Sequence, residues 1–215
     1  IPKPMIKIGK IPLIVHIMNI YSFYGFKEFI IAAGYKAQVI KDYFSRFKKF
    51  KNIKIIQTGT NSMTGERILR LRKHLEGDEN FLLTYGDGVS NLNIKNVINY
   101  HLKHKKIATM TAVRPPVKFG ELTIGKNNRV KKFVEKPQLK KGWINGGFFV
   151  LNKKIFKYLK GNNLVFEKKP LSKLCKDGEL RAYVHNGYWR CMDNLNEKNQ
   201  LEEIFKKKKT IWKIK

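Results

Sequence analysis

Short apolar segments alternate with amphipathic segments in the first half of the chain, and this alternation limits the possible folds more than any other sequence feature. Short apolar runs are typical of buried strands, whereas apolar side chains spaced three and four residues apart indicate helices. Strands that alternate with helices favour a parallel sheet covered by helices on both faces. The predicted helices are 11–24, 36–47, 64–75 and 94–105, and the predicted strands are 29–33, 53–57, 81–85 and 108–113.

The pattern changes after Arg114, where two prolines follow and turn residues become more frequent. Residues 121–124 and 130–135 flank a Gly-Lys-Asn-Asn segment, which predicts a β-hairpin. We therefore expect an α/β fold with a Rossmann-like, mixed but mostly parallel sheet flanked by helices, and a small antiparallel C-terminal layer. No repeat or linker divides the chain, which predicts a single domain over residues 1–215. The remaining predicted elements are strands 146–151 and 182–185 and helices 154–160, 167–176 and 196–208.

The formal net charge of +29 is compatible with nucleic-acid binding. Only eight of the 45 basic residues are arginine, although groove readers and phosphate clamps favour its planar guanidinium. The lysines are spread along the chain, and Lys, Asn, Ile, Phe and Tyr, which have A/T-rich codons, are all abundant. We therefore attribute the charge to compositional bias and expect no nucleic-acid partner. Affinity for duplex DNA at about 150 mM salt would test this.

The cysteine content and the hydropathy pattern bear on the cellular location. Cys175 and Cys191 are the only cysteines, so a disulfide framework is excluded. No signal peptide is visible, and the longest apolar runs are too short to span a bilayer. These features predict a cytoplasmic protein with no membrane partner.

One carboxylate lies between two glycines at the end of a predicted strand, in the segment LLTYGDGVSNL of residues 82–92. In open α/β sheets, ligands bind beyond the carboxyl ends of the strands. Gly86 and Gly88 would let a ligand approach the backbone, and Asp87 offers a hard oxygen to a divalent cation. An ordinary turn has the same composition, so this segment alone leaves both interpretations open.

Similar alternatives remain open at other positions. Residues 61–65 open a predicted helix, whose N–H groups could bind a phosphate or could form a simple cap. The segment 145–147 could line a pocket or form a bulge, and Asp193 could bind a cation or cap the next helix. His101 and His104 lack a third ligand and lie on a lysine-rich helix face, so we expect both at the surface.

Taken together and in order, these segments resemble the sugar-nucleotide pyrophosphorylases, a nucleotidyltransferase family, and are most similar to its glucose-1-phosphate cytidylyltransferase branch. The opening IPKPMIKIG resembles the end of the family signature G-x-G-T-R-x-x-P-x-T-x-x-x-P-K-P-M. The likeness covers essentially the whole chain. The other segments that carry it are NSMTGERI, LLTYGDGVSNLNI, EKP, INGGFFVLN and GYWRCMDNLNEKNQLE.

Two parts of the family pattern have no counterpart in the printed sequence. The glycine-rich loop, which cradles the triphosphate, would precede Ile1. A longer family loop, which helps to form the nucleotide pocket and subunit contacts, is replaced by four residues between Phe47 and Asn52.

The resemblance implies the reaction CTP + α-D-glucose 1-phosphate → CDP-glucose + pyrophosphate, which would supply polysaccharides such as O-antigen. It also implies Mg²⁺ as cofactor, a homo-oligomer, and Lys3, Asp87 and Lys136 as catalytic residues. Asp87 and Asp193 would hold the metal. Lys3 would contact the nucleotide phosphates and Lys136 the sugar phosphate. The nucleotide would be bound by Ser62, Thr64, Gly65, Arg67 and Gly86, and the sugar phosphate by Phe119, Gly120, Glu135, Lys136, Asn145 and Gly146.

Two other functions are compatible with parts of this pattern. A uridylyl- or thymidylyltransferase would keep the fold and change the base, and base choice cannot be worked out from the residues themselves. A metal-dependent glycosyltransferase also uses an acidic motif at a strand end, but it usually has Asp-x-Asp where this chain has Gly-Asp-Gly.

Overall fold

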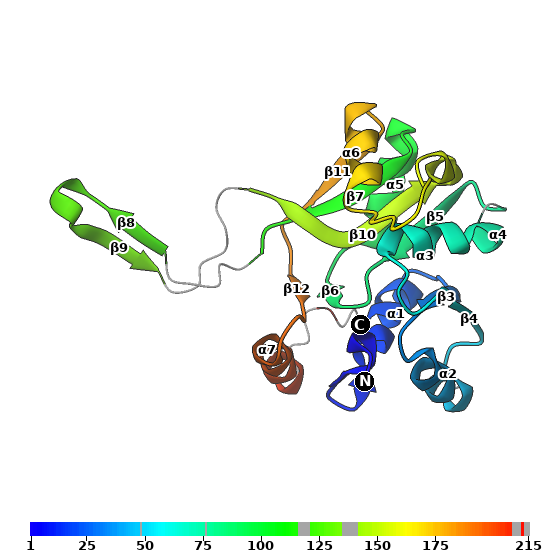
Figure 1. The fold of residues 1–215 in the computed structure, drawn as a ribbon. Coiled ribbons are helices and arrows are strands. Elements are labelled where there is room, and N and C mark those ends of the chain that lie inside the picture. Colours follow the sequence, from blue (N-terminus) through cyan, green and yellow to red (C-terminus); the bar gives the residue numbers. More distant parts are fainter. Residues whose placement is uncertain (48, 76, 116–120, 135–141, 208–211, 213–215) are drawn as a thin grey trace.

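A four-stranded mixed sheet forms the centre of the computed structural model (Figure 1). The strand order is β11–β7–β10–β5. β11 pairs with β7 in parallel, whereas β10 runs antiparallel to both of its neighbours, β7 and β5. The structure describes residues 1–47, 49–75, 77–115, 121–134, 142–207 and 212. The four strands are β5 (Asn80–Thr84), β7 (Ala108–Val113), β10 (Ile144–Asn152) and β11 (Leu180–His185).

The other strands of the described ranges form two-stranded pairs. β3 (Glu28–Ala33) and β4 (Asn52–Gln57) pair in parallel around a helix, as the alternating pattern predicts. The predicted hairpin is confirmed as β8 (Glu121–Ile124) and β9 (Val130–Val134). The remaining antiparallel pairs are β1 (Lys7–Ile8) with β2 (Ile11–Pro12) and β6 (Gly88–Ser90) with β12 (Trp189–Cys191).

Seven α-helices and three short 3₁₀ helices lie in the described residues. None of these helices has both the length and the apolar character needed to cross a bilayer. The α-helices are α1 (Leu13–Phe23), α2 (Ala37–Arg46), α3 (Thr64–Arg70), α4 (Arg72–Leu75), α5 (Ile94–His104), α6 (Lys169–Lys176) and α7 (Leu195–Lys206). The 3₁₀ helices are η1 (Lys3–Met5), η2 (Lys126–Asn128) and η3 (Lys153–Lys157).

The predicted α/β class is confirmed, with differences in detail. The predicted helix 11–24 begins two residues later, because Ile11 pairs with Ile8 across a tight turn in which Gly9 has a φ of +64°. The predicted helix 64–75 is interrupted at Leu71 and becomes α3 and α4. The predicted helix 154–160 is only the 3₁₀ helix η3. β10 belongs to the half of the chain expected to form a separate antiparallel layer, yet it lies inside the main sheet.

β10 is buried on both faces, and its side chains join the two largest apolar cores. Phe148 and Val150 pack into one core with residues of α1, α5 and α7. Phe149 and Leu151 point the other way and pack with residues of α3 and α6. Successive side chains of a strand point to opposite faces, so this four-residue apolar run lets one strand support both layers.

The expectation that His101 and His104 lie at the surface is wrong for His101, which is 2% exposed. Its Nδ1 lies 2.9 Å from the Thr109 hydroxyl oxygen, and its Nε2 lies 3.1 Å from Asn80 Oδ1. His104 Nε2 lies 2.7 Å from the same Thr109 oxygen. The two histidines therefore join α5 to β7 and β5, and their polar partners come from strands that the helix pattern does not reveal.

We predict that His101 makes the fold sensitive to acid. Burial, and secondly the nearby His104, lower the pKa of His101 from 6.5 to about 4. The unfolded chain then binds more protons than the folded chain between these values, so stability is retained above pH 6.5 and is lost as the pH falls towards 4. The loss attributable to His101 is at most about 3 kcal/mol.

Urea unfolding of the wild type and of His101→Gln between pH 4 and pH 7 would measure this contribution. We expect the free energy of unfolding to depend less on pH in the variant. The exposed His74 provides the control, since His74→Gln should keep the wild-type slope. A His101→Gln protein with an unchanged slope would contradict the prediction.

Candidate functional site

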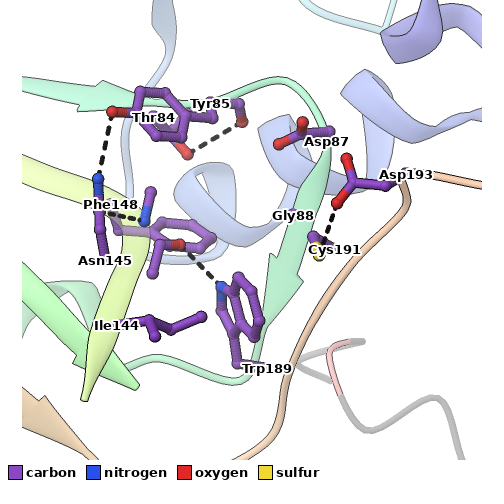
Figure 2. A pocket seen from close by; sticks show the side chains of 12 residues that line it. Thr84, Tyr85, Asp87, Gly88, Ile144, Asn145, Phe148, Trp189, Cys191 and Asp193 are labelled. Carbon is purple, nitrogen blue, oxygen red and sulfur yellow. Dashed lines mark hydrogen bonds between the residues drawn. The ribbon is translucent and has the colours of Figure 1, made fainter. Parts of the chain in front are cut away.

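A pocket of about 250 Å³ lies where β5 ends and β10 begins (Figure 2). Its lining comes from three parts of the chain: the end of β5 with the turn into β6, the first half of β10, and β12 with the loop that follows. The pairing of β6 with β12 brings the first and third parts together. The Asp87 carbonyl also accepts the N–H of Met192 at 2.9 Å, which places the loop after β12 beside Asp87.

Two carboxylates and one ammonium group meet at this pocket. Lys3 Nζ lies 3.3 Å from Asp87 Oδ2 and 2.8 Å from Asp193 Oδ1. The hydrogen bond to Asp193 holds the pKa of Lys3 above its usual value of 10.5, so the ammonium stays charged. The structure therefore brings together three residues that the sequence analysis assigned to the metal and the phosphates.

Gly86 explains how Lys3 reaches the two carboxylates. A Cβ atom on Gly86 would lie 2.7 Å from Pro4 Cγ, which is closer than carbon atoms can approach without displacement. Glycine at this position lets η1 pack directly against the end of β5, and Lys3 is the first residue of η1. Gly86 was predicted to lie near the nucleotide, and its observed neighbour is this proline.

The donor atoms at the site suit a hard divalent cation. Asp87 and Asp193 provide carboxylate oxygens, which are the ligands that Mg²⁺ prefers. Cys191 lies within 4.8 Å of Asp193 and Glu197, but its Sγ donates a hydrogen bond to Asp193 Oδ2 at 3.5 Å. Burial, and then the adjacent carboxylates, raise the pKa of the Cys191 thiol to about 12. Glu197 already accepts the Asp193 N–H at 2.6 Å. Asp87 and Asp193 are therefore the two residues best suited to hold a metal.

The start of β10 forms another wall of the pocket. Asn145 Oδ1 accepts the Gly147 N–H at 2.8 Å, and Asn145 Nδ2 donates to the Tyr85 hydroxyl at 3.3 Å. Gly147 has a φ of +76°, and the pairing of β10 with β7 shifts register between Asn145 and Phe149. The segment 145–147 is therefore a bulge that also lines the pocket, so the two alternatives left open by the sequence are both realised.

The predicted nucleotide-binding residues of the segment 62–67 do not line this pocket. The Gly65 N–H donates to the Leu164 carbonyl at 2.8 Å, and a Cβ on Gly65 would lie 2.7 Å from that oxygen. The Ser62 hydroxyl donates to the Gly59 carbonyl at 2.8 Å, and Arg67 Nε donates to the Ser62 carbonyl at 3.0 Å. These contacts cap α3 internally, so the role of Ser62, Thr64, Gly65 and Arg67 toward a nucleotide stays a prediction.

Phe119, Gly120, Glu135 and Lys136, which were assigned to the sugar phosphate, lie outside the described residues. Conversely, the structure adds Tyr85 and Trp189 to the pocket. The indole Nε1 of the buried Trp189 donates to the Gly146 carbonyl at 2.8 Å. Both aromatic residues lie next to motif residues in the sequence, and that proximity was the only signal available for them.

Comparisons with known proteins show which sequences and solved structures this chain resembles. The model of the family described as "Nucleotidyl transferase" matches residues 1–197. Glucose-1-phosphate cytidylyltransferase of Salmonella typhimurium is 42% identical over 234 aligned residues, which cover 99% of this chain and 91% of the relative. A probable glucose-1-phosphate cytidylyltransferase of Bacillus subtilis is 39% identical, and the alignment covers 100% of this chain and 92% of the relative.

Among solved structures, HddC from Yersinia pseudotuberculosis superposes with a TM-score of 0.76. The two sequences are 26% identical, and the match covers 95% of this chain and 90% of HddC. This similarity supports the fold independently of the sequence relatives.

We predict that the hydrogen bond of Trp189 stabilises the bulge at the start of β10. Trp189→Phe removes the indole N–H and leaves the Gly146 carbonyl without this donor, which typically costs about 1–3 kcal/mol. Chemical denaturation should therefore show a lower midpoint for the variant than for the wild type.

The neighbouring Tyr188 provides a matched control. Its hydroxyl is buried and has no hydrogen-bond partner among the described residues. Tyr188→Phe removes a buried hydroxyl without breaking such a bond, so it should not lower the free energy of unfolding. Equal losses of stability in the two variants would contradict the assigned role of the Trp189 N–H.

Proposed function

Because the chain belongs to the nucleotidyl transferase family, we propose that it makes CDP-glucose and pyrophosphate from CTP and α-D-glucose 1-phosphate. The observation that carries this proposal is the identity of 39–42% to glucose-1-phosphate cytidylyltransferases along nearly the whole chain. The pocket supports it, because a charged cluster for phosphates lies beside a neutral polar wall that suits a sugar.

The reaction needs no covalent intermediate on the protein. A phosphate oxygen of glucose 1-phosphate attacks the α-phosphorus of CTP, a new P–O bond forms, and the bond to the β-phosphate oxygen breaks as pyrophosphate leaves. Catalysis then depends on holding two anions in line and on neutralising their charge.

Lys3, Asp87 and Asp193 are the residues we assign to charge neutralisation. A Mg²⁺ ion held by Asp87 and Asp193 would supply positive charge to the phosphate oxygens. The Lys3 ammonium is a point charge on a flexible stem, so it can turn from the carboxylates toward a phosphate of the bound nucleotide. The three side chains are partly exposed, which leaves them accessible to substrate.

The sugar pocket is assigned to the start of β10. Asn145 and Gly146 line the cavity next to Tyr85, and the Asn145 amide offers a hydrogen-bond donor to sugar oxygens. Glu135 and Lys136 at the sugar phosphate, and Phe119 and Gly120 at the hexose, remain part of the proposal. Mg²⁺ as the physiological cation, a homo-oligomeric assembly, cytoplasmic location and a role in O-antigen supply are likewise proposed.

The proposed reaction predicts which nucleotide base the protein prefers. With glucose 1-phosphate and Mg²⁺, pyrophosphate release by the full gene product should be fastest with CTP among CTP, UTP, dTTP and GTP. Coupled measurement of pyrophosphate, with mass spectrometry of the sugar nucleotide, would identify the product. Faster release with UTP or dTTP would favour a uridylyl- or thymidylyltransferase, and absence of pyrophosphate with all four would overturn the proposed reaction.

The proposed metal site predicts the effect of substitutions at Asp87 and Asp193. Asp87→Asn keeps the side-chain shape and removes one charged ligand, and loss of such a preorganised contact typically lowers kcat about 10²–10³-fold. Asp193→Asn should behave similarly. Because both residues would hold one ion, the double variant should lose far less than the product of the two single losses.

Asp177→Asn is the matched control, because Asp177 pairs with Lys173 on α6, away from the pocket. It should keep wild-type kcat, and melting temperatures would confirm that every variant is folded. An Asp87→Asn protein that is folded and keeps more than about a third of the wild-type kcat would argue against the metal site.

A further inference from the structure

A continuous chain of side-chain hydrogen bonds runs from the start of α3 to the sugar side of the pocket. The Thr64 hydroxyl donates to Glu167 Oε2 at 2.6 Å, and the Tyr85 hydroxyl donates to Glu167 Oε1. Asn145 Nδ2 donates in turn to the Tyr85 hydroxyl oxygen at 3.3 Å. Figure 2 shows the last of these bonds on the pocket wall. Four segments that are distant in sequence are therefore joined by one chain of hydrogen bonds, with Thr64 and Tyr85 both bonded to the Glu167 carboxylate.

The charge of Glu167 determines the direction of every hydrogen bond in this chain. An ionised carboxylate can only accept, so both hydroxyl groups must donate to it. Burial, reinforced by the hydrogen bond to Glu167, raises the pKa of Tyr85 above its usual value of 10.0, so its hydroxyl keeps the proton. The Tyr85 oxygen is consequently left as an acceptor, and it receives the Asn145 amide.

The orientation of the Asn145 amide follows from the same chain. Its oxygen accepts the Gly147 N–H at 2.8 Å, and one amide hydrogen points to Tyr85. These contacts use only one of the two amide hydrogens. Asn145 lines the cavity, so the wall of the pocket presents an N–H donor suited to a hydroxyl oxygen of a sugar.

On the opposite side, Glu167 secures the segment that caps α3. The Thr64 hydroxyl oxygen accepts the Phe166 N–H at 2.9 Å, while its hydrogen goes to Glu167. The Leu164 carbonyl of the same segment accepts the Gly65 N–H. Glu167 thus connects the helix start predicted to bind the nucleotide with the wall predicted to bind the sugar, although it does not line the cavity itself.

We propose that Glu167 is a positioning residue, which acts through Tyr85 to orient the Asn145 amide toward a hydroxyl oxygen of the sugar phosphate substrate. This inference rests on the proposed function, since it assigns the sugar to the wall formed by Asn145. A purely structural role, in which Glu167 only fastens its loop to α3, would stabilise the fold without affecting sugar binding.

The test measures steady-state kinetics of Glu167→Ala, Glu167→Gln and Tyr85→Phe with the full gene product. Loss of one oriented hydrogen bond is expected to raise KM for glucose 1-phosphate about tenfold, with kcat within about threefold of wild type. Glu167→Gln should be intermediate, because it replaces one of the two accepting carboxylate oxygens by an NH2 group that can only donate. In the Tyr85→Phe background, Glu167→Ala should not raise this KM further.

Glu79→Gln serves as the matched control. Glu79 is an exposed carboxylate that pairs with Lys153 at the opposite end of β10. Its substitution should leave the KM for CTP and the KM for glucose 1-phosphate unchanged. A Glu167→Ala protein with a lower melting temperature but wild-type KM for glucose 1-phosphate would show that Glu167 only stabilises the fold, and would overturn the proposal. Additive effects of Glu167→Ala and Tyr85→Phe would also overturn the proposal.

Failure of the proposed function can be recognised separately. If the wild type releases no pyrophosphate, calorimetric binding of glucose 1-phosphate to the wild type and to Glu167→Ala replaces the kinetic assay. About tenfold weaker binding by the variant would support the positioning role despite the missing reaction. Equal affinity of the two proteins, or no binding by either, would overturn it.

Discussion

β10 has to be buried on both faces and still begin at an open pocket, and the rest of the structure depends on this constraint. Its four-residue apolar run joins the two large cores, so the strand cannot shift by one residue without exchanging the side chains of both. That register determines where the bulge at Asn145–Gly147 lies. It also determines which carbonyl meets the Trp189 indole and which amide meets Tyr85.

The charged part of the site is assembled by backbone contacts rather than by the charges themselves. Asp87 follows β5, and the pairing of β6 with β12 brings Asp193 within reach of the same ammonium group. Two like-charged carboxylates near one point repel each other unless a cation lies between them. Lys3 supplies that charge, and the contact of Pro4 with Gly86 holds Lys3 in place. The backbone therefore holds the two carboxylates close together, and the Lys3 ammonium offsets their repulsion.

Features that repeat locally along the sequence could be predicted, whereas features that depend on distant partners could not. Apolar periodicity located most helices and strands and the β8–β9 hairpin, and a resemblance located Lys3, Asp87 and Asp193. The same reasoning misplaced His101, because its partners Thr109 and Asn80 lie on strands and are not visible in a helix pattern. It could not anticipate that Leu164 caps the start of α3, since about a hundred residues separate the two. Glu167 belonged to a predicted helix and carried no motif at all.

The ion pairs of Lys3 connect residues that are 84 and 190 positions apart in the sequence. During synthesis on the ribosome, Lys3 emerges long before Asp193, because 190 positions separate the two residues. Contacts between such distant residues form after local structure, because closing a long loop costs entropy that only later packing offsets. The sheet and its helices can therefore be largely in place while the charged cluster is still incomplete. A truncated chain that stopped before Asp193 would retain both large cores in part and would lack the second carboxylate altogether.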